Sequence, residues 1–336
     1  MHLLRKLLLP FVPVYYVVTW LRNKLYDVGV FKSTEYNFPV IAVGNLSVGG
    51  TGKTPMIEYL VRLLGKDRTL ATLSRGYRRG TKGFLLANGE TKVEDIGDEP
   101  FQFHSKFEDL LVCVDEDRRH GIAVLRELKN APEIILLDDA FQHRKVKAGF
   151  YVLLTSYSKL YANDILLPTG DLREPRSGAK RADVIVVTKC PNNLGEVEKT
   201  EIIKQLKPNE GQEVFFSSID YSDVLKGRKG EIALDLLKGK PFSLVTGIAN
   251  PKPLLEYLKS FQLEFKHLNF KDHHDFSESE IDMLKNEELI ITTEKDYMRL
   301  SPHFKNQDDL FYLPIEVQLD KPELFNSKVN TFVNQF

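Results

Sequence analysis

Residues 41–55 read IAVGNLSVGGTGKTP, and the fold is inferred outward from this stretch. The apolar run FPVIAV at 38–43 predicts a buried strand. A glycine-rich turn follows, and Gly-Lys-Thr opens a predicted helix over 55–65. Strand, glycine-rich turn, Gly-Lys-Thr and helix in this order are typical of the phosphate-binding loop of nucleoside triphosphatases and kinases. The expected fold class is α/β, with a P-loop NTPase-like, mostly parallel sheet.

The residues of this loop have separate chemical roles. Glycines allow backbone N–H groups to turn inward around a phosphate, and the helix N-terminus adds partial positive charge. Lys53 can reach the β- and γ-phosphates, and the Thr54 hydroxyl can bind Mg²⁺. The residues expected to bind ATP are Ser47, Val48, Gly49, Gly50, Thr51, Gly52, Lys53 and Thr54. Ser47 stands where the standard pattern has glycine, and a plain glycine-rich turn is the alternative interpretation.

Length and composition limit the class of protein. A chain of 336 residues predicts two domains, and 42% hydrophobic with 28% charged residues is ordinary for a folded globular protein. The net charge of −1 provides no global field that attracts nucleic acid. The two cysteines, Cys113 and Cys190, exclude a disulfide framework and fit a reducing compartment.

The N-terminal segment 1–26 differs from the rest of the chain. Residues 7–21 carry no charge, and cations flank them at Arg5, Lys6, Arg22 and Lys24. The run is shorter than the roughly 20 apolar residues of a spanning helix, and it lacks the small-residue cleavage site of a signal peptide. We therefore expect an amphipathic helix that rests on an anionic membrane surface, with a core-packed helix as the alternative.

Residues 133–144, EIILLDDAFQHR, carry the second strong signal. Four apolar residues at 134–137 predict a buried strand, which ends in Asp138 and Asp139. Carboxylates at such a position, downstream of a phosphate loop, have the form of a Walker B site for Mg²⁺. Two adjacent carboxylates repel each other, so a nearby cation explains their presence better than the alternative of an ordinary turn.

Three further loops carry candidate functional residues. The strand predicted at 68–74 runs into RGYRRG, and Asp98 lies in GDEP, where capping of a helix is the competing interpretation. The loop at 166–176 holds Arg173 and Glu174, with surface ion pairs as its alternative. Ligands of open α/β sheets bind at the carboxyl ends of strands, which favours a functional interpretation of the arginine loop.

A second, smaller α/β domain is expected after a charged stretch around 205–240. We place the boundary so that 27–225 form the kinase domain and 226–336 the smaller domain. Strands are predicted at 242–247, 262–268, 289–293 and 309–315. The loop DHHD at 272–275 precedes a helix, and a histidine aimed at the cleft between the domains is favoured over a metal site or a plain polar loop.

Taken together, these motifs resemble those of the lipid A kinases, or tetraacyldisaccharide 4′-kinases, which phosphorylate the disaccharide lipid precursor of bacterial lipopolysaccharide. The resemblance rests on an ordered set that spans most of the chain: GNLSVGGTGKTP (44–55), SRGYRR (74–79), GDEP (97–100), DDAFQHR (138–144), LPTGDLREP (167–175), VTKC (187–190), DHH (272–274) and TEKDYMRL (293–300). Ser47 belongs to this family's own version of the loop, whereas Ala140 stands where the family has glycine.

The resemblance implies an activity and a location. ATP and Mg²⁺ are the implied cofactors, and the implied reaction is phosphorylation of the 4′-hydroxyl of a tetraacyldisaccharide 1-phosphate. The partners expected are this glycolipid and the inner-membrane surface, without nucleic acid or an obligate protein partner. The protein is expected on the cytoplasmic face of the bacterial inner membrane, as a peripheral protein.

The resemblance also implies residue roles. Asp98 and His273 correspond to a catalytic pair, and Lys53 acts on the transferring phosphoryl group. The implied metal-site residues are Thr54, Asp138, Asp139 and Glu174. The arginines implied to neutralise phosphate, on ATP or on the lipid, are Arg75, Arg78, Arg118 and Arg173.

Two other functions compete with this interpretation. A membrane-associated P-loop ATPase or GTPase switch would act through partner binding, but Val48 replaces the first lysine of positioning ATPases. GTPases carry Asn-Lys-x-Asp, and TKCP at 188–191 lacks that pattern. A kinase for a small soluble metabolite would leave the N-terminal segment unexplained.

Overall fold

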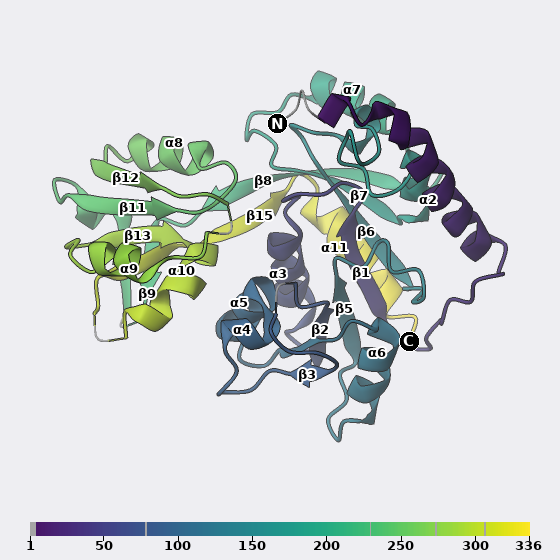
Figure 1. Ribbon diagram of the computed structural model, residues 1–336, viewed down its shortest axis with the longest axis horizontal. Coiled ribbons are helices and arrows are strands. Elements are labelled where there is room, and N and C mark those ends of the chain that lie inside the picture. Colours follow the sequence, from purple (N-terminus) through teal and green to yellow (C-terminus); the bar gives the residue numbers. More distant parts are fainter. Residues whose placement is uncertain (1–4, 78, 229, 273, 306) are drawn as a thin grey trace.

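Two β-sheets organise the chain in this computed structural model, which describes residues 5–336 except 78, 229, 273 and 306. Within the described residues the larger sheet has nine strands in the order β15-β8-β7-β6-β1-β5-β2-β4-β3, and the smaller has six in the order β10-β9-β14-β13-β11-β12. Figure 1 shows the small sheet and its helices beside the large one. The expected α/β class with a mostly parallel sheet is confirmed.

The phosphate-loop strand lies near the middle of the large sheet. Strand β1 pairs in parallel with β5 on one side and β6 on the other. Parallel pairing continues through β2, β4, β7 and β8, so their carboxyl ends meet at one edge. The strands are β1 (Val40–Asn45), β2 (Leu70–Ser74), β3 (Leu85–Leu86), β4 (Leu111–Val114), β5 (Ile134–Asp138), β6 (Phe150–Ser156), β7 (Val184–Thr188), β8 (Glu213–Tyr221) and β15 (Ile315–Leu319).

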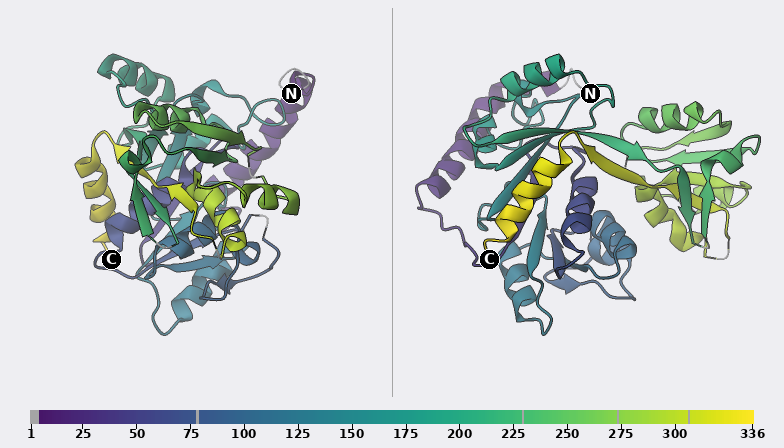
Figure 2. Two further views of the ribbon diagram at one scale, coloured as in Figure 1. Left: turned by 90° about the vertical axis from the view of Figure 1, so that its left-hand side faces the viewer. Right: turned by 180° about the vertical axis from the view of Figure 1, so that it is seen from behind.

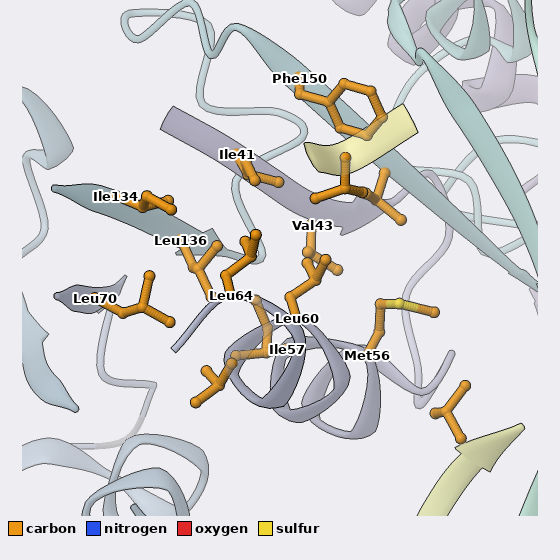
Figure 3. Packing of buried hydrophobic residues seen from close by; sticks show 14 of the residues in the cluster. Ile41, Val43, Met56, Ile57, Leu60, Leu64, Leu70, Ile134, Leu136 and Phe150 are labelled. Atoms are coloured by element: carbon orange, nitrogen blue, oxygen red, sulfur yellow. The ribbon is translucent and has the colours of Figure 1, made fainter. Parts of the chain in front are cut away.

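Helices cover both faces of this sheet because alternate side chains of each strand point to opposite faces. Ile41 and Val43 belong to the core under α3, α5 and α11, whereas Val40 and Ala42 belong to the core that includes α6. Figure 3 shows the side chains of α3 packed against β1 and β5. The helices of this domain are α3 (Lys53–Leu64), α4 (Val93–Ile96), α5 (Asp98–Lys106), α6 (Arg118–Glu127), α7 (Glu196–Leu206) and α11 (Pro322–Val333), with short 3₁₀ segments η2 (Tyr161–Asn163) and η3 (Arg176–Arg181).

The small domain has its own core and a parallel centre. Strands β12, β11, β13 and β14 run parallel, and β9 and β10 complete the sheet in antiparallel pairing. Its elements are β9 (Val224–Gly227), β10 (Gly230–Ala233), η4 (Leu234–Leu237), β11 (Phe242–Thr246), α8 (Lys252–Ser260), β12 (Phe265–Asn269), α9 (Glu278–Leu284), β13 (Ile290–Thr293), α10 (Glu294–Leu300), η5 (Ser301–His303) and β14 (Leu310–Leu313).

The expected C-terminal domain of 226–336 is wrong at its end. Strand β15 pairs antiparallel with β8 in the large sheet, and α11 packs Phe325 and Val329 into the large domain's core. The small domain is therefore an insertion between β8 and β15, and the chain returns to the large domain afterwards (Figure 2). A strand's own residues do not say which sheet it joins, which is why the sequence pattern placed residues 315–336 in the small domain.

The N-terminal segment forms η1 (Leu9–Phe11) and α2 (Val12–Asp27). Figure 1 shows α2 along the outer edge of the large domain, away from the small domain. Among the described residues, no helix combines the length and apolar character needed to cross a membrane. Large apolar side chains are nevertheless exposed along this segment, at Leu7, Leu8, Leu9, Phe11, Val14, Tyr16, Val17, Val18, Trp20 and Leu21.

Candidate active site

The phosphate loop connects β1 to α3 and has the backbone shape of an anion cradle. Gly52 is the N-cap of α3 with φ of 84°, and Gly49 has φ of 111°. Residues with a Cβ rarely adopt such positive φ angles, so glycine is required at both places. Asn45 at the end of β1 donates from Nδ2 to Thr51 Oγ1 at 2.7 Å, which ties the loop to the strand. Helix α3 then starts at Lys53, so its N-terminus faces the loop.

Neighbouring strands brace this loop from both sides. The Thr188 hydroxyl, at the end of β7, donates to the Thr51 carbonyl at 2.8 Å, and Lys189 Nζ donates to the Gly50 carbonyl at 2.6 Å. The Val48 N–H donates to the Asp171 carbonyl at 2.8 Å. The predicted ATP-binding residues Ser47 to Thr54 are thus brought together in one loop that is held rigidly enough to be pre-organised for a phosphate.

The two predicted metal carboxylates lie directly beside the loop. Asp138 ends β5 and is paired with Val43 of β1, which places Asp138 and Asp139 at the same sheet edge as Lys53. Lys53 Nζ is 3.7 Å from Asp139 Oδ1. Arg173 donates to Asp139 from Nη1 at 3.1 Å and from Nη2 at 2.8 Å. Asp139 is therefore held by two cations.

The two carboxylates differ in their protonation. Burial raises the pKa of Asp138 from 3.8 to about 7. The positive charge of Lys53 acts to lower this pKa, whereas the negative charges of Asp139 and Glu99 act to raise it. Burial also acts to raise the pKa of Asp139, but Lys53 and Arg173 outweigh it and lower that pKa to about 2. Among the residues that the structure describes, Asp138 Oδ1 is buried and has no hydrogen-bond partner. A buried carboxylate oxygen without a partner, next to an ionised carboxylate, fits a divalent cation.

The donor set also agrees with Mg²⁺ rather than with a metal held by protein alone. Within the described residues, no group of three or more histidine, cysteine or acidic side chains converges as a metal cage. Mg²⁺ is usually bound through one or two carboxylates together with substrate phosphates and water. Asp138, Asp139 and the Thr54 hydroxyl at the start of α3 are the residues that fit this role.

The structure places Glu174 in a different role from the predicted metal ligand. Its side chain is 1% exposed. Its oxygens accept from Arg181 Nη2 at 2.8 and 2.9 Å, from Asn23 Nδ2 at 2.6 Å and from Gln142 Nε2 at 2.9 Å. These donors use the lone pairs that a metal would need, so we correct the expectation: Glu174 joins α2 to the loop after Asp139 and does not contribute to the metal site.

The four predicted phosphate-binding arginines have separate positions. Arg173 is paired with Asp139, and Arg118 is buried and donates to the Asp115 carbonyl at 3.1 Å and the Asp138 carbonyl at 3.4 Å. Burial lowers the pKa of Arg118, and Asp138 and Asp139 oppose that shift. Arg75 is exposed just after β2, where a ligand could meet it. Arg78 lies outside the described residues.

Asp98 and Glu99 open α5 and face charged side chains of the small domain. Arg299 of α10 donates to Asp98 from Nε at 3.1 Å and also from Nη2. Burial lowers the pKa of Lys295, while the charges of Glu99, Asp272 and Asp98 act to raise it. Asp98 is therefore at the contact between the two domains, as the predicted catalytic pair requires, but its partner His273 lies outside the described residues.

Sequence reasoning assigned no role to Lys189, Lys295 or Arg299, although each lies in a motif that carried the family resemblance. Lys189 has φ of 58°, an uncommon value for a residue with a side chain. Lys189 has this backbone conformation where its side chain contacts Gly50, and the sequence TKCP gives no signal that would predict either feature. Lys295 and Arg299 are spaced four apart in TEKDYMRL, the spacing that puts two residues on one face of a helix.

Comparison with known proteins gives a consistent result. The family model described as tetraacyldisaccharide-1-P 4′-kinase matches residues 4–334. A Flavobacterium johnsoniae protein named tetraacyldisaccharide 4′-kinase is 53% identical over 319 residues, covering 94% of this chain and 93% of that protein. A Phocaeicola vulgatus protein of the same name is 43% identical over 351 residues, covering 99% and 96%.

A solved structure agrees as well. The crystal structure of LpxK from Aquifex aeolicus in complex with ATP superposes with a TM-score of 0.79 at 32% sequence identity, and the match covers 98% of this chain and 99% of that one. Both the sequence and the fold therefore match from one end to the other, and the chain belongs to the tetraacyldisaccharide-1-phosphate 4′-kinase family.

Proposed function

We propose that this kinase binds ATP on the 47–54 loop and transfers its γ-phosphoryl group to the 4′-hydroxyl of a tetraacyldisaccharide 1-phosphate in the cleft at Asp98, while α2 rests on the inner membrane. Family membership makes the chain a 4′-kinase. The observation that carries the residue assignment is the meeting of Lys53, Asp138 and Asp139 at one sheet edge, where the charge of Glu99, the neighbour of Asp98 on α5, also acts on Asp138.

The residues of the loop bind and orient the nucleotide. Backbone N–H groups of the loop and the N-terminus of α3 hold the phosphates, and Lys53 places its charge at the β- and γ-phosphates. Asp138, Asp139 and Thr54 would hold Mg²⁺, which when bound neutralises charge on the transferring group. Arg173 fixes the Asp139 carboxylate with two hydrogen bonds, which keeps it ionised and in one orientation.

Asp98 is the proposed acceptor for the proton of the sugar hydroxyl. A carboxylate at the first position of a helix is close to free backbone N–H groups, which favours its ionised form. Phosphoryl transfer proceeds through a loose transition state, so orientation of the hydroxyl matters more than strong basicity. His273 stays in the proposal as the partner of Asp98 in the loop before α9, a role that follows from the family resemblance.

The exposed side of α2 supports the proposed membrane contact. Leu7, Phe11, Val14 and Val18 are 74, 60, 64 and 60% exposed, a contiguous apolar surface on a short segment. The polar side docks on the large domain through Asn23, which contacts Glu174. An apolar surface at this edge would let the acyl chains of the substrate stay in the lipid while the sugar enters the cleft. We place the protein on the cytoplasmic face of the inner membrane as a peripheral protein.

A transfer assay tests this function. Purified protein is incubated with γ-labelled ATP, Mg²⁺ and a tetraacyldisaccharide 1-phosphate in mixed micelles, and label is counted in the organic phase. We expect lipid-bound label from the wild type and at least a hundredfold less from Lys53→Ala, because one electrostatic contact to the transferring group contributes about 3–4 kcal/mol. Lys66→Ala, at the exposed far end of α3, is the matched control and should behave as wild type. Release of free phosphate alone would favour an ATPase switch and reject the kinase assignment.

A further inference from the structure

Arg299 is a side chain of the small domain that contacts two parts of the proposed catalytic apparatus at once. It projects from α10, and its side chain is 9% exposed. Its guanidinium donates to both carboxylate oxygens of Asp98, from Nε to Oδ1 at 3.1 Å and from Nη2 to Oδ2. Its Nη1 donates to the backbone carbonyl of His274 at 3.1 Å. One planar group therefore links α5 of the large domain to the loop that precedes α9.

Several charged groups lie near the ion pair of Asp98 and Arg299. Burial acts to lower the pKa of Arg299, but the hydrogen bonds and charge of Asp98 outweigh it and raise that pKa. Other charged groups act on the pair from α10 and from the loop before α9. Asp296 and Asp275 act on Arg299, and Lys295 interacts with both Arg299 and Asp98. Three carboxylates, Asp98, Asp296 and Asp275, therefore act on one guanidinium, which donates hydrogen bonds to Asp98.

A guanidinium fork is suited to fixing direction as well as charge. Two parallel N–H···O bonds define the plane of the carboxylate, whereas a lysine at the same place would supply only a point charge. Alignment of the carboxylate matters in a kinase, because the acceptor carboxylate mainly orients the hydroxyl and the transition state needs little proton removal.

We infer that Arg299 is a positioning residue of the phosphotransfer site, which, held by the His274 carbonyl, aligns the Asp98 carboxylate only when the small domain is docked on α5. This inference rests on the proposed function, because it takes Asp98 as the acceptor of the hydroxyl proton. It gives a role to Arg299, the second-last residue of the motif TEKDYMRL, which lies outside the phosphate loop. The small domain would thus supply the side chain that orients Asp98, the proposed base of the large domain.

The test compares two substitutions of Arg299 with one control. Arg299→Gln removes the charge, Arg299→Lys keeps the charge and loses the fork, and Arg228→Gln changes an exposed arginine of the same domain that donates to the Lys305 carbonyl. For each full-length protein, kcat is measured from pH 5 to 9, together with KM for ATP and the melting temperature. Asp98→Asn serves as the reference for loss of the base.

We expect Arg299→Gln to lower kcat at pH 7 by about 10–100-fold, with KM for ATP within about twofold. The acid limb of kcat should move to higher pH by about one unit or more, because loss of a paired cation favours the protonated carboxyl. In Arg299→Lys, the pH at which kcat falls on the acid side should lie close to the wild-type value, because the charge is kept. Its kcat should recover only in part, because the fork is lost. Arg228→Gln should match the wild type in all three measurements.

The outcomes separate this inference from the proposed function. Failure of the wild type to label the lipid, or full activity of Asp98→Asn, would reject the proposed function itself. An active wild type and an inactive Asp98→Asn, combined with an Arg299→Gln protein whose kcat and acid limb are unchanged, would reject the positioning role alone. A fall in kcat that follows a fall in melting temperature, with the acid limb unmoved in both Arg299 variants, would make Arg299 purely structural and would also overturn the inference.

Discussion

Asp138→Asn is expected to stabilise the metal-free protein while it abolishes catalysis. The pKa of Asp138 is raised from 3.8 to about 7, so the folded protein disfavours the ionised form. At about 1.4 kcal/mol per pKa unit, this corresponds to roughly 4 kcal/mol of lost stability at high pH. The cost is absent below pH 3.8, where both states are protonated, grows as the pH rises, and is complete above about pH 7.

The observable gain is smaller than this figure. An asparagine at 138 buries an amide whose hydrogen bonds are incompletely satisfied, at a cost of about 1–3 kcal/mol. A net gain of about 2 kcal/mol at pH 8 remains, which for a domain of this size corresponds to a rise in melting temperature of roughly 4 °C. The gain should shrink toward pH 4. Kinase activity should fall at least a hundredfold, because one of the carboxylates proposed to bind Mg²⁺ is lost.

The adjacent Asp139 provides a matched control with the opposite sign. Its pKa is lowered to about 2, so the ionised form stabilises the folded protein at neutral pH, and that contribution is lost as pH falls from 3.8 through 2. Because 40% of the Asp139 side chain is exposed, solvent screens its pairs with Lys53 and Arg173, and we expect Asp139→Asn to cost only about 1 kcal/mol.

The assay is thermal unfolding of both variants without metal at pH 5 and pH 8, with circular dichroism and calorimetry as independent probes. The reasoning is refuted if Asp138→Asn lowers the melting temperature at pH 8, or if its gain is as large at pH 5 as at pH 8. Either result would mean that Asp138 is not an ionised, uncompensated carboxylate in the folded metal-free protein.

Two further predictions concern α2 and its attachment. Val14→Asp and Val18→Asp should weaken sedimentation with anionic vesicles at least tenfold without lowering the melting temperature, whereas Val197→Asp, 77% exposed on α7, should not; equal sedimentation of all three proteins would exclude α2 as the membrane contact. Glu174→Gln should destabilise the protein by about 3 kcal/mol or more in urea unfolding, because it leaves the Arg181 charge without its counter-ion in a largely buried site. A loss within a few tenths of a kcal/mol, as expected of an exposed ion pair, would contradict the burial described for Glu174.

The strands that lead into the phosphate loop and into Asp138 could be predicted because their patterns lie in contiguous residues. In each case an apolar run defines the strand, and the polar residues that follow it are placed at the sheet edge by chain connectivity alone. Glu174 misled the sequence interpretation for the same reason. Its local pattern is that of a ligand, and only its burial against Arg181 and Asn23 shows that its oxygens are already used.

Contacts between distant residues could not be predicted. Asp98 and Arg299 are 201 positions apart, and no local pattern in either motif specifies the other. Strand β8 lies in a segment whose charged surroundings indicated a domain boundary. The strand predicted at 309–315 corresponds to β14 and reaches only the first residue of β15, so neither β15 nor its place in the large sheet was predicted.

The two strands that connect the domains also determine how the small domain meets α5, where Asp98 lies. The two connections run side by side, since β8 pairs with β15 and the Ser222 N–H donates to the Pro314 carbonyl at 3.0 Å. Paired strands bend more readily than they separate, so the small domain can move mainly toward or away from α5. At that contact, Lys106 of α5 lies 2.6 Å from both Glu58 of α3 and Glu294 of α10.

This second set of ion pairs adds to the contact between Asp98 and Arg299. Burial and the charge of Glu58 raise the pKa of Glu294, so the contact is weakened as pH rises and Glu294 is forced to ionise. Separation of the two domains would expose Glu58 on the phosphate-loop helix and break the ion pair between Asp98 and Arg299 in the same movement. A substitution at this contact should therefore reduce kcat before it reduces the stability of either domain, because each domain keeps its own hydrophobic core.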